Sequence, residues 1–284
     1  MGLLRFRNPL VYPGGQAGVN WNHPASVGLR YSLVAKNPVP ASATPGSGGG
    51  MLRVDPGGPT GIAGGSNYNS TYQNNQVIPI IGPAWITVTA SVAITVPNVT
   101  AETPAALTFA AILVINSSVS SGYICGNSSP NSGNTPSSLS VWSLTPSLII
   151  GGSTQFGFGM TLAIGVPYFI VCSYKPSLGT NNFNIGVTNL LTGQVYTGVG
   201  SSAAAIPTSN STPYWIGCRN VATTQANAWL ATCMHSVAYL TAPQVKQWCY
   251  ALWDFWFPPA SQGLILLASK KMTARSLRQV RVLG

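Results

Sequence analysis

Carboxyl groups, which glycoside hydrolysis uses in pairs, are rare in this chain of 284 residues. Its acidic residues are Asp55, Glu102 and Asp254. A glycosidase holds two carboxyl groups about 5–10 Å apart. These three come from distant segments, and Asp55 belongs to a turn-forming Asp-Pro-Gly sequence. The sequence therefore argues against a glycosidase.

Neither histidine has the neighbours that a catalytic base needs. A Ser-His-Asp or Cys-His site requires a third group that orients the base, and no acid lies near His23 or His235 in the sequence. The cysteines are odd in number and too widely spaced for a metal motif or a complete set of disulfides. They are Cys125, Cys172, Cys218, Cys233 and Cys249. We therefore predict no catalytic residue, no metal, no cofactor and no enzymatic activity.

The composition indicates a globular protein with an unusually uncharged surface. Hydrophobic residues make up 45% of the chain, enough for a sizeable core, and charged residues only 6%, against about a quarter in ordinary domains. A surface of Ser, Thr, Asn, Gln and Gly repels other molecules weakly. This predicts a homo-oligomer or a protein packed against a partner. No segment approaches the roughly 20 apolar residues of a membrane span, so no membrane association is expected.

The net charge of +10 reflects the shortage of acids and a basic C-terminal tail. Clustered basic residues can neutralise phosphates, but this tail has no interleaved aromatic residues for base stacking. An acidic protein surface is therefore the preferred partner and nucleic acid the weaker alternative. The predicted partner-binding residues are Arg5 and Arg7 at the N-terminus and Lys270, Lys271, Arg275, Arg278 and Arg281 in the tail.

Most of the chain has the pattern of β-strands. Residues 84–96 alternate between apolar and small polar side chains, which predicts one strand with one buried face. Residues 107–115 form a nearly continuous apolar run, which is typical of a central strand. Clusters of Ser, Asn, Gly and Pro separate further short strands. Together they indicate an antiparallel sandwich or barrel.

One short helix is predicted near the end of this region. Thr241 and Gln244 have the spacing of a capping box, in which each side chain can bond to the other residue's backbone N–H. Val245 and Trp248 follow at helical spacing and predict a buried face. The Pro-Pro pair beginning at Pro258 ends the pattern.

These patterns divide the chain into three predicted regions. Residues 1–18 form an N-terminal arm. Residues 19–259 form one β-sandwich domain, with a Gly-, Pro- and Ser-rich loop at 37–50. Residues 260–284 form a basic C-terminal arm.

The order of the last elements resembles the end of a laminin-G-like, or concanavalin A-like, jelly roll. It is carried by the segments Trp215–Asn220 and Trp229–Tyr239, followed by Leu240-Thr241 and the capped helix. Val19–Pro24 resembles the start of such domains in tailed bacteriophages. The resemblance implies an all-β, antiparallel jelly-roll β-sandwich with one short C-terminal helix and extended terminal arms. The aspartates of the family's calcium sites are missing, so no metal site is carried over.

The same resemblance implies a non-enzymatic virion structural protein of a tailed phage, assembled in the host cytoplasm. Such a protein would decorate or cement the capsid, or serve as another head or tail accessory. Its arms would bind the major capsid protein or tail components. The alternative is a glycan- or receptor-binding lectin-like module of a tail fibre that contacts a host surface glycan. Tyr68 and Tyr72 are its candidate glycan contacts.

Overall fold

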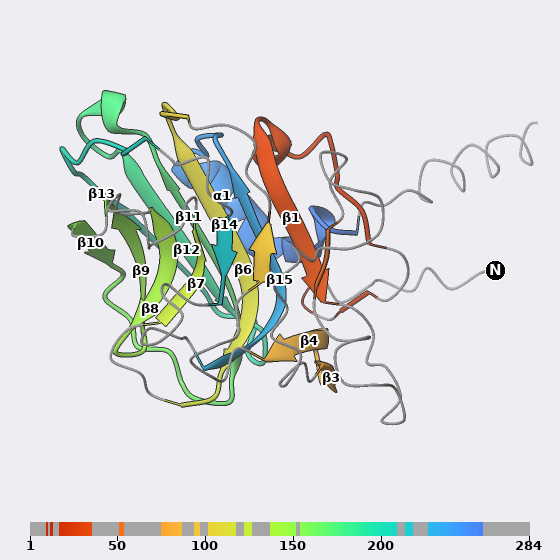
Figure 1. Ribbon diagram of the computed structural model, residues 1–284. Coiled ribbons are helices and arrows are strands. Elements are labelled where there is room, and N and C mark those ends of the chain that lie inside the picture. The colour runs from red at the N-terminus through yellow and green to blue at the C-terminus, as the bar shows by residue number, and fades with distance from the viewer. Residues whose placement is uncertain are drawn as a thin grey trace, which may run out of the picture.

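The computed structural model shows two antiparallel β-sheets packed face to face, with a short helical layer on the outer face of the larger sheet (Figure 1). The structure describes residues 10, 12–13, 17–35, 51–53, 75–86, 94–96, 102–117, 122–126, 137–151, 154–208, 214–217 and 227–257. The prediction of an all-β antiparallel sandwich with one short helix is confirmed.

The larger sheet has nine strands, seven of them in one continuous order. From edge to edge these are β13 (Val195–Gly200), β12 (Phe183–Asn189), β11 (Pro167–Tyr174), β6 (Leu107–Ile115), β15 (Ala228–Ser236), β1 (Leu29–Ala35) and β2 (Met51–Arg53). The other two are β4 (Gly82–Ile86), which also pairs with β15, and β3 (Asn75–Ile78), which pairs with β4.

The smaller sheet has six strands. Their order is β10 (Thr154–Gly157), β9 (Thr145–Ile150), β8 (Ser138–Trp142), β7 (Gly122–Gly126), β14 (Tyr214–Ile216) and β5 (Ile94–Val96). The first four are consecutive in the chain and run as a meander, whereas β14 and β5 come from distant segments.

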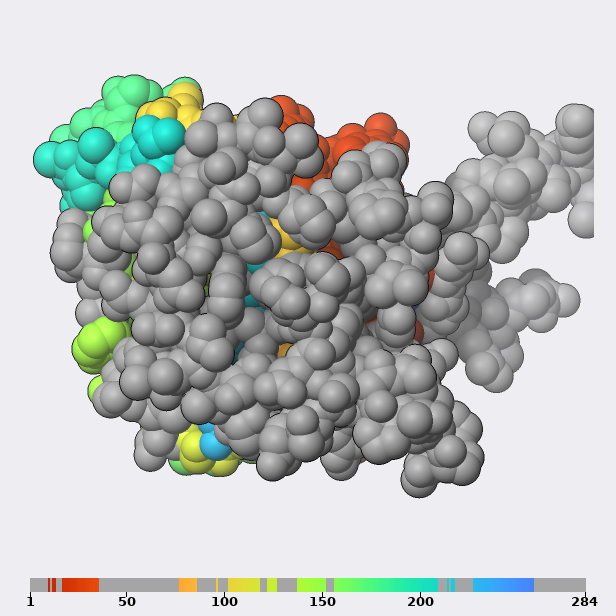
Figure 2. Space-filling model, in the orientation of Figure 1, coloured from red at the N-terminus to blue at the C-terminus, as the bar shows by residue number. Residues whose placement is uncertain are grey.

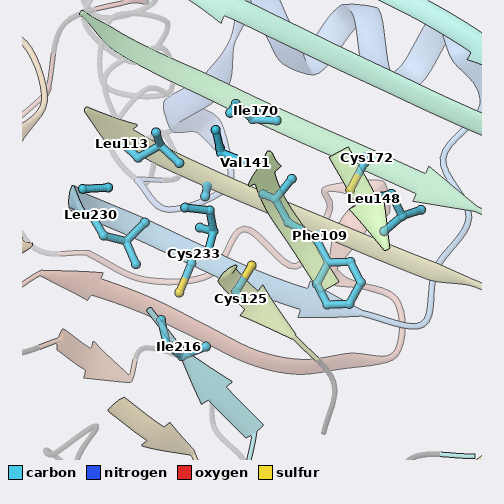
Figure 3. Packing of buried hydrophobic residues seen from close by; sticks show 14 of the residues in the cluster. Phe109, Leu113, Cys125, Val141, Leu148, Ile170, Cys172, Ile216, Leu230 and Cys233 are labelled. Atoms are coloured by element: carbon cyan, nitrogen blue, oxygen red, sulfur yellow. The ribbon is translucent and has the colours of Figure 1, made fainter. Parts of the chain in front are cut away.

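Strand β6 lies at the centre of the larger sheet, and all nine of its residues are buried. Its continuous apolar sequence follows from having a core on each face. Phe109 and Leu113 belong to the core between the two sheets, shown in Figure 3. Ala110 and Ile112 belong to a second core on the opposite face.

The second core lies between the larger sheet and the C-terminal helical layer. This layer consists of α1 (Ala242–Tyr250) and the 3₁₀ helix η4 (Leu252–Asp254). It is rich in aromatic residues, which bury large apolar areas on a small helix. Trp248, Trp253, Phe255 and Trp256 are all buried here.

The start of α1 is held by the predicted pair of residues. Gln244 Oε1 accepts hydrogen bonds from the Thr241 N–H and hydroxyl, both at 2.9 Å. The sheet also anchors the preceding residue, because the Leu240 N–H donates to Ser173 Oγ at 2.7 Å and its carbonyl accepts from Asn184 Nδ2 at 2.9 Å. The start of α1 is therefore fixed both by the cap within the helix and by hydrogen bonds from the larger sheet to Leu240.

The structure corrects one strand prediction. The segment 84–96 is not a single strand, because β4 pairs with β15 in the larger sheet while β5 pairs with β14 in the smaller one. Alternation indicates that a strand buries one face, but it does not say which sheet supplies the neighbours. The helix also ends at Tyr250, earlier than the end that the Pro-Pro pair beginning at Pro258 predicted.

The predicted C-terminal arm and the loop at 37–50 lie outside the described residues. Part of the predicted N-terminal arm is described and contacts the domain. The Tyr12 ring lies 5.4 Å from the Trp253 ring and 5.3 Å from the Phe257 ring, centroid to centroid. Within the described residues, no helix is long and apolar enough to cross a membrane.

Helix α1 packs directly against Gly186 in β12. A Cβ atom there would lie 2.5 Å from Cys249 Sγ and 2.8 Å from a Val245 methyl group. Gly186→Ala should therefore lower the free energy of unfolding by about 1–3 kcal/mol through overpacking. Denaturant titration measures this value. Gly159→Ala is the control, since nothing lies within 4 Å of a Cβ at that position. Equal midpoints for the two variants would contradict this account of the helix packing.

Candidate functional site

Most of the predicted site residues lie outside the described part of the chain. This applies to Tyr68 and Tyr72, and to all the basic residues assigned to the two arms. Asp55 is outside it as well. Thr241 and Gln244 are described and form the helix cap.

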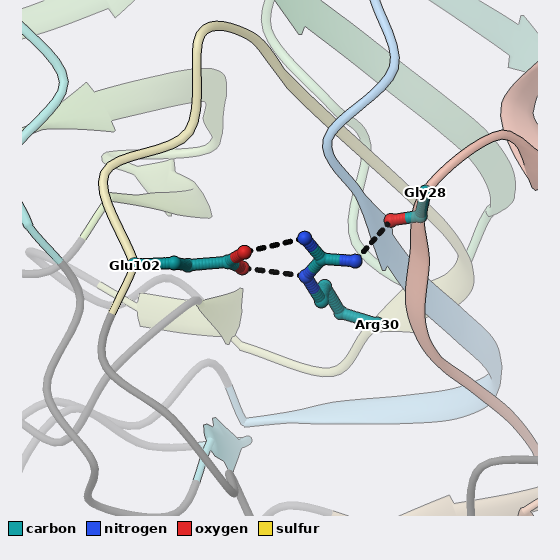
Figure 4. A network of polar contacts seen from close by, with 3 residues as sticks. All are labelled: Gly28, Arg30 and Glu102. Atoms are coloured by element: carbon teal, nitrogen blue, oxygen red, sulfur yellow. Dashed lines mark hydrogen bonds and ion pairs between the residues drawn. The ribbon is translucent and has the colours of Figure 1, made fainter.

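Glu102 is engaged in an ion pair with Arg30 of β1 (Figure 4). The guanidinium donates through Nε to Oε1 at 2.5 Å and through Nη2 to Oε2, and its Nη1 donates to the Gly28 carbonyl at 3.1 Å. Both side chains are partly exposed, so the pair contributes at most about 1 kcal/mol. Its two-point geometry ties the segment before β6 to the start of β1. We assign it a structural role.

His235 lies in the core between the sheets and does not reach solvent. Its ring stacks on Phe109 with centroids 4.5 Å apart and contacts the rings of Tyr31 and Tyr214. Nδ1 lies 3.4 Å from the Thr108 carbonyl oxygen, and Nε2 has no hydrogen-bond partner. Burial lowers the pKa of His235 to about 3, so the ring is neutral and serves as an aromatic core residue.

The described cysteines are also core residues. Cys125, Cys172, Cys233 and Cys249 are free and buried. Burial raises the pKa of Cys125 and of Cys249 to about 12, which keeps these thiols protonated and unreactive. In the described ranges, no group of three or more His, Cys, Asp or Glu side chains could hold a metal ion.

Exposed aromatic side chains remain as candidates for binding. Three stand out among the described residues: Trp21, Tyr250 and Trp142, exposed by 55%, 54% and 43%. Tyr250 is the last residue of α1, and Trp142 faces Thr145 at the tip of the β8–β9 hairpin. Only Trp21 has a side-chain amide on each side in the sequence, from Asn20 and Asn22. We define the Trp21 loop as residues 18–27.

The backbone of the Trp21 loop is fastened to the helical layer. The Gly18 N–H donates to the Trp256 carbonyl at 2.8 Å, and the Asn20 N–H donates to the Phe255 carbonyl at 2.9 Å. Two backbone carbonyl groups that follow η4 therefore fix the position of the first residues of the Trp21 loop. Figure 2 shows the N-terminal residues, drawn in red, reaching the molecular surface.

Ser26 closes the loop on the other side of Trp21. Its hydroxyl lies 3.0 Å from the Trp21 carbonyl oxygen and 2.7 Å from the His23 carbonyl oxygen, and donates to this pair. The Ser26 N–H also donates to the His23 carbonyl at 2.9 Å. Because the backbone is held before and after Trp21, the loop presents the indole from a fixed position.

His23 connects this loop to the second core. Its ring lies 4.4 Å from the Trp248 ring, centroid to centroid, and contacts the edge of Phe255. Nδ1 accepts the Ala25 N–H at 3.1 Å, which leaves the proton of the neutral ring on Nε2. Burial lowers the pKa of His23 to about 4. The His23 ring is therefore neutral at pH 7 and packs between the Trp21 loop and the aromatic residues of the second core.

The exposed part of the loop combines an apolar ring with hydrogen-bonding groups. Asn20 Oδ1 accepts from the Asn22 N–H at 3.1 Å, which leaves its Nδ2 group available. The Asn22 side chain is exposed. In the sequence, Val19–Pro24 indicated only a resemblance to a family. The Asn-Trp-Asn order was a usable signal, but exposure of the ring was not visible in the pattern.

No protein-family model matches the chain, and no curated protein does. Solved structures that resemble it include a sialidase from Trypanosoma rangeli in complex with 2,3-difluorosialic acid, at 12% identity and a TM-score of 0.49. That match covers 79% of this chain and 33% of the sialidase. The NanB sialidase from Streptococcus pneumoniae matches at 13% identity and a TM-score of 0.39, over 50% of this chain and 24% of that one.

The receptor-binding domain of botulinum neurotoxin type G resembles the chain at 12% identity and a TM-score of 0.48, over 78% of this chain and 50% of that domain. This chain therefore spans between a quarter and a half of the length of these three structures. At such identities the likeness concerns the all-β fold alone.

These comparisons contradict two predictions from the sequence. A non-enzymatic structural protein of a tailed-phage virion was expected, but the sialidases are enzymes and none of the three structures is a virion protein. The expectation of no enzymatic activity is contradicted by the same sialidases. Both predictions relied on the shortage of acids and on short motifs, neither of which identifies a ligand.

His235 generates a prediction about acid stability. Its pKa is about 3 in the folded protein and about 6.5 when unfolded, so protons bind preferentially to the unfolded chain below pH 6.5. The resulting loss of stability grows as the pH falls from about 6.5 to 3. At pH 4 it amounts to about 3 kcal/mol.

The variant His235→Phe keeps an aromatic ring against Phe109 and removes the titrating group. The drop in unfolding free energy between pH 7 and pH 4, measured by denaturant titration, should shrink by about 3 kcal/mol in this variant. His23 remains and contributes a loss of the same sign, because its pKa is also lowered, to about 4. An unchanged drop in His235→Phe would show that His235 is accessible to protons in the folded state.

Proposed function

We propose that this chain is a carbohydrate-binding β-sandwich whose ligand stacks on Trp21. The supporting observation is an indole exposed by 55% on a loop whose backbone is hydrogen-bonded on both sides of it. Pre-organisation of this kind lowers the entropy lost on binding.

The chemistry around the ring favours a sugar over an apolar partner. A pyranose has an apolar C–H face that matches an indole, and hydroxyl groups at its rim that exchange hydrogen bonds with amides. Asn20 and Asn22 provide such amides. A purely apolar partner would bury these amides without compensation, which is costly.

The expected affinity of one such platform is low. An aromatic contact adds about 0.5–1.5 kcal/mol beyond its buried area, and each hydrogen bond adds about 0.5–1.5 kcal/mol. A total of about 4 kcal/mol corresponds to a Kd of about 1 mM. Multivalent display is therefore the appropriate format for detecting binding.

We also propose that the sandwich is a jelly roll of the concanavalin A-like type. Support comes from the two stacked antiparallel sheets and from the position of β15, which lies between β6 and β1 and leads into the capped helix. This arrangement matches the order of elements on which the sequence resemblance was based.

Trp21→Ala tests the proposed function. On a multivalent glycan array containing hexoses, N-acetylhexosamines and sialic acids, the unmodified chain should bind at least one glycan. Trp21→Ala should reduce that binding at least tenfold, because the stacking surface is lost, while Trp21→Phe should retain part of it. A solution titration with the bound glycan, followed by NMR, checks the change in Kd.

Trp142→Ala is the matched control, since it removes another exposed indole at a different place in the fold. It should bind as the unmodified chain does. A blank array for the unmodified chain would refute the proposal. So would a Trp21→Ala variant that binds normally.

A further inference from the structure

Among the strands that the structure describes, β13 lies at an edge of the larger sheet and pairs only with β12, at the left in Figure 1. We infer that two copies of this chain associate by antiparallel pairing of β13 with β13, which joins their larger sheets into one. The inference goes beyond carbohydrate binding and does not depend on it, since β13 contributes no residue to the Trp21 loop.

The backbone groups of β13 alternate between facing β12 and facing away from it. The Asn189 N–H donates to the Gln194 carbonyl at 2.9 Å, so the hydrogen-bonded pairs of the β12–β13 ladder fall at every second residue. In the observed register these pairs include Val187 with Tyr196 and Ile185 with Gly198. The backbone groups of the alternate residues 195, 197 and 199 therefore point away from β12.

These outward backbone groups have no hydrogen-bond partner among the described contacts. An edge with unpaired N–H and C=O groups is a template for another strand. Proteins usually block such edges with lysine, proline or a bulge. The sequence from Val195 to Gly200 contains no charged residue and no proline, and Val199 is 52% exposed.

Strand β13 is complementary to itself in one register. A two-fold axis at Thr197 places Thr197 opposite Thr197 of the second copy. Val199 then lies opposite Val195 of the second copy, and Val195 lies opposite Val199 of the second copy. Residues 195, 197 and 199 are those whose backbone groups point outward, so this register makes about six hydrogen bonds across the interface. The exposed valine gains an apolar cross-strand partner.

The other face of the strand fits the same register. Tyr196 lies opposite Gly198 of the second copy, and an aromatic ring across from a glycine compensates for the missing side chain. A side chain at Gly198 itself is excluded, because a Cβ there would lie 2.4 Å from the Phe158 ring. Two equivalent tyrosine–glycine pairs therefore form across the interface. The interface is isologous and closes at two copies.

A cysteine at the proposed two-fold axis tests the register directly. In a hydrogen-bonded antiparallel pair the two opposed Cα atoms are about 5.5 Å apart, a separation that a disulfide can span. Oxidation of Thr197→Cys should therefore produce a covalent dimer of twice 29.6 kDa, seen on non-reducing gels. Thr192→Cys, exposed in the adjoining hairpin loop, and the unmodified chain should stay monomeric on these gels. Equal cross-linking of the three proteins, or none in Thr197→Cys, would overturn the inference.

Sedimentation equilibrium tests the association without cross-linking. The unmodified chain should be dimeric at high concentration and dissociate on dilution, because a contact of one strand per copy is small. Val199→Lys should weaken the dimer at least tenfold by placing a charge at the edge. Val77→Lys, which changes a valine exposed by 64% on β3, should leave it unchanged. A monomer at concentrations up to about 1 mM, where a contact with a Kd of 1 mM would be well populated, would refute the pairing. So would a Val199→Lys variant that dimerises normally.

Discussion

The burial of β6 on both faces is the constraint on which the rest of the structure depends. In a two-layer sandwich each sheet has one face in the core and the other in solvent, so a strand buried on both faces requires a third layer. The smaller sheet covers one side. The other side is covered by α1, η4 and the aromatic residues that follow them. The short helix is therefore an essential third layer, and its tryptophans supply the area that so few residues must cover.

The position of the Trp21 loop, where we propose that carbohydrate binds, follows from this third layer. The backbone after η4 carries carbonyl groups that the helix does not use, and the loop before β1 uses two of them through Gly18 and Asn20. His23 inserts between the loop and Trp248. The same contacts that complete the second core thus hold Trp21 outward. The stability of the fold and the proposed binding therefore depend on one set of interactions.

The low charge content has consequences throughout the fold. Among the described residues that could do acid–base chemistry, His235 is buried in the core and Glu102 is bound to Arg30, whereas Asp254 of η4 is exposed. With so few charges, the sheet edge at β13 has no lysine to block it. A surface that relies on amides, hydroxyls and aromatic rings for contact suits neutral ligands and copies of the same chain.

Local patterns determined the strand at 107–115, the capped start of the helix and the all-β class, because each depends on side-chain periodicity or on residues a few positions apart. The absence of an acid near His235 in the sequence argued against a catalytic base, and the structure places this ring in the core. The division of 84–96 between two sheets, the exposure of Trp21 and the edge position of β13 were decided only by the tertiary structure. Each of these depends on contacts between segments far apart in the chain, such as Asn20 with Phe255 or β4 with β15. A periodic pattern shows that a face is covered, but not what covers it.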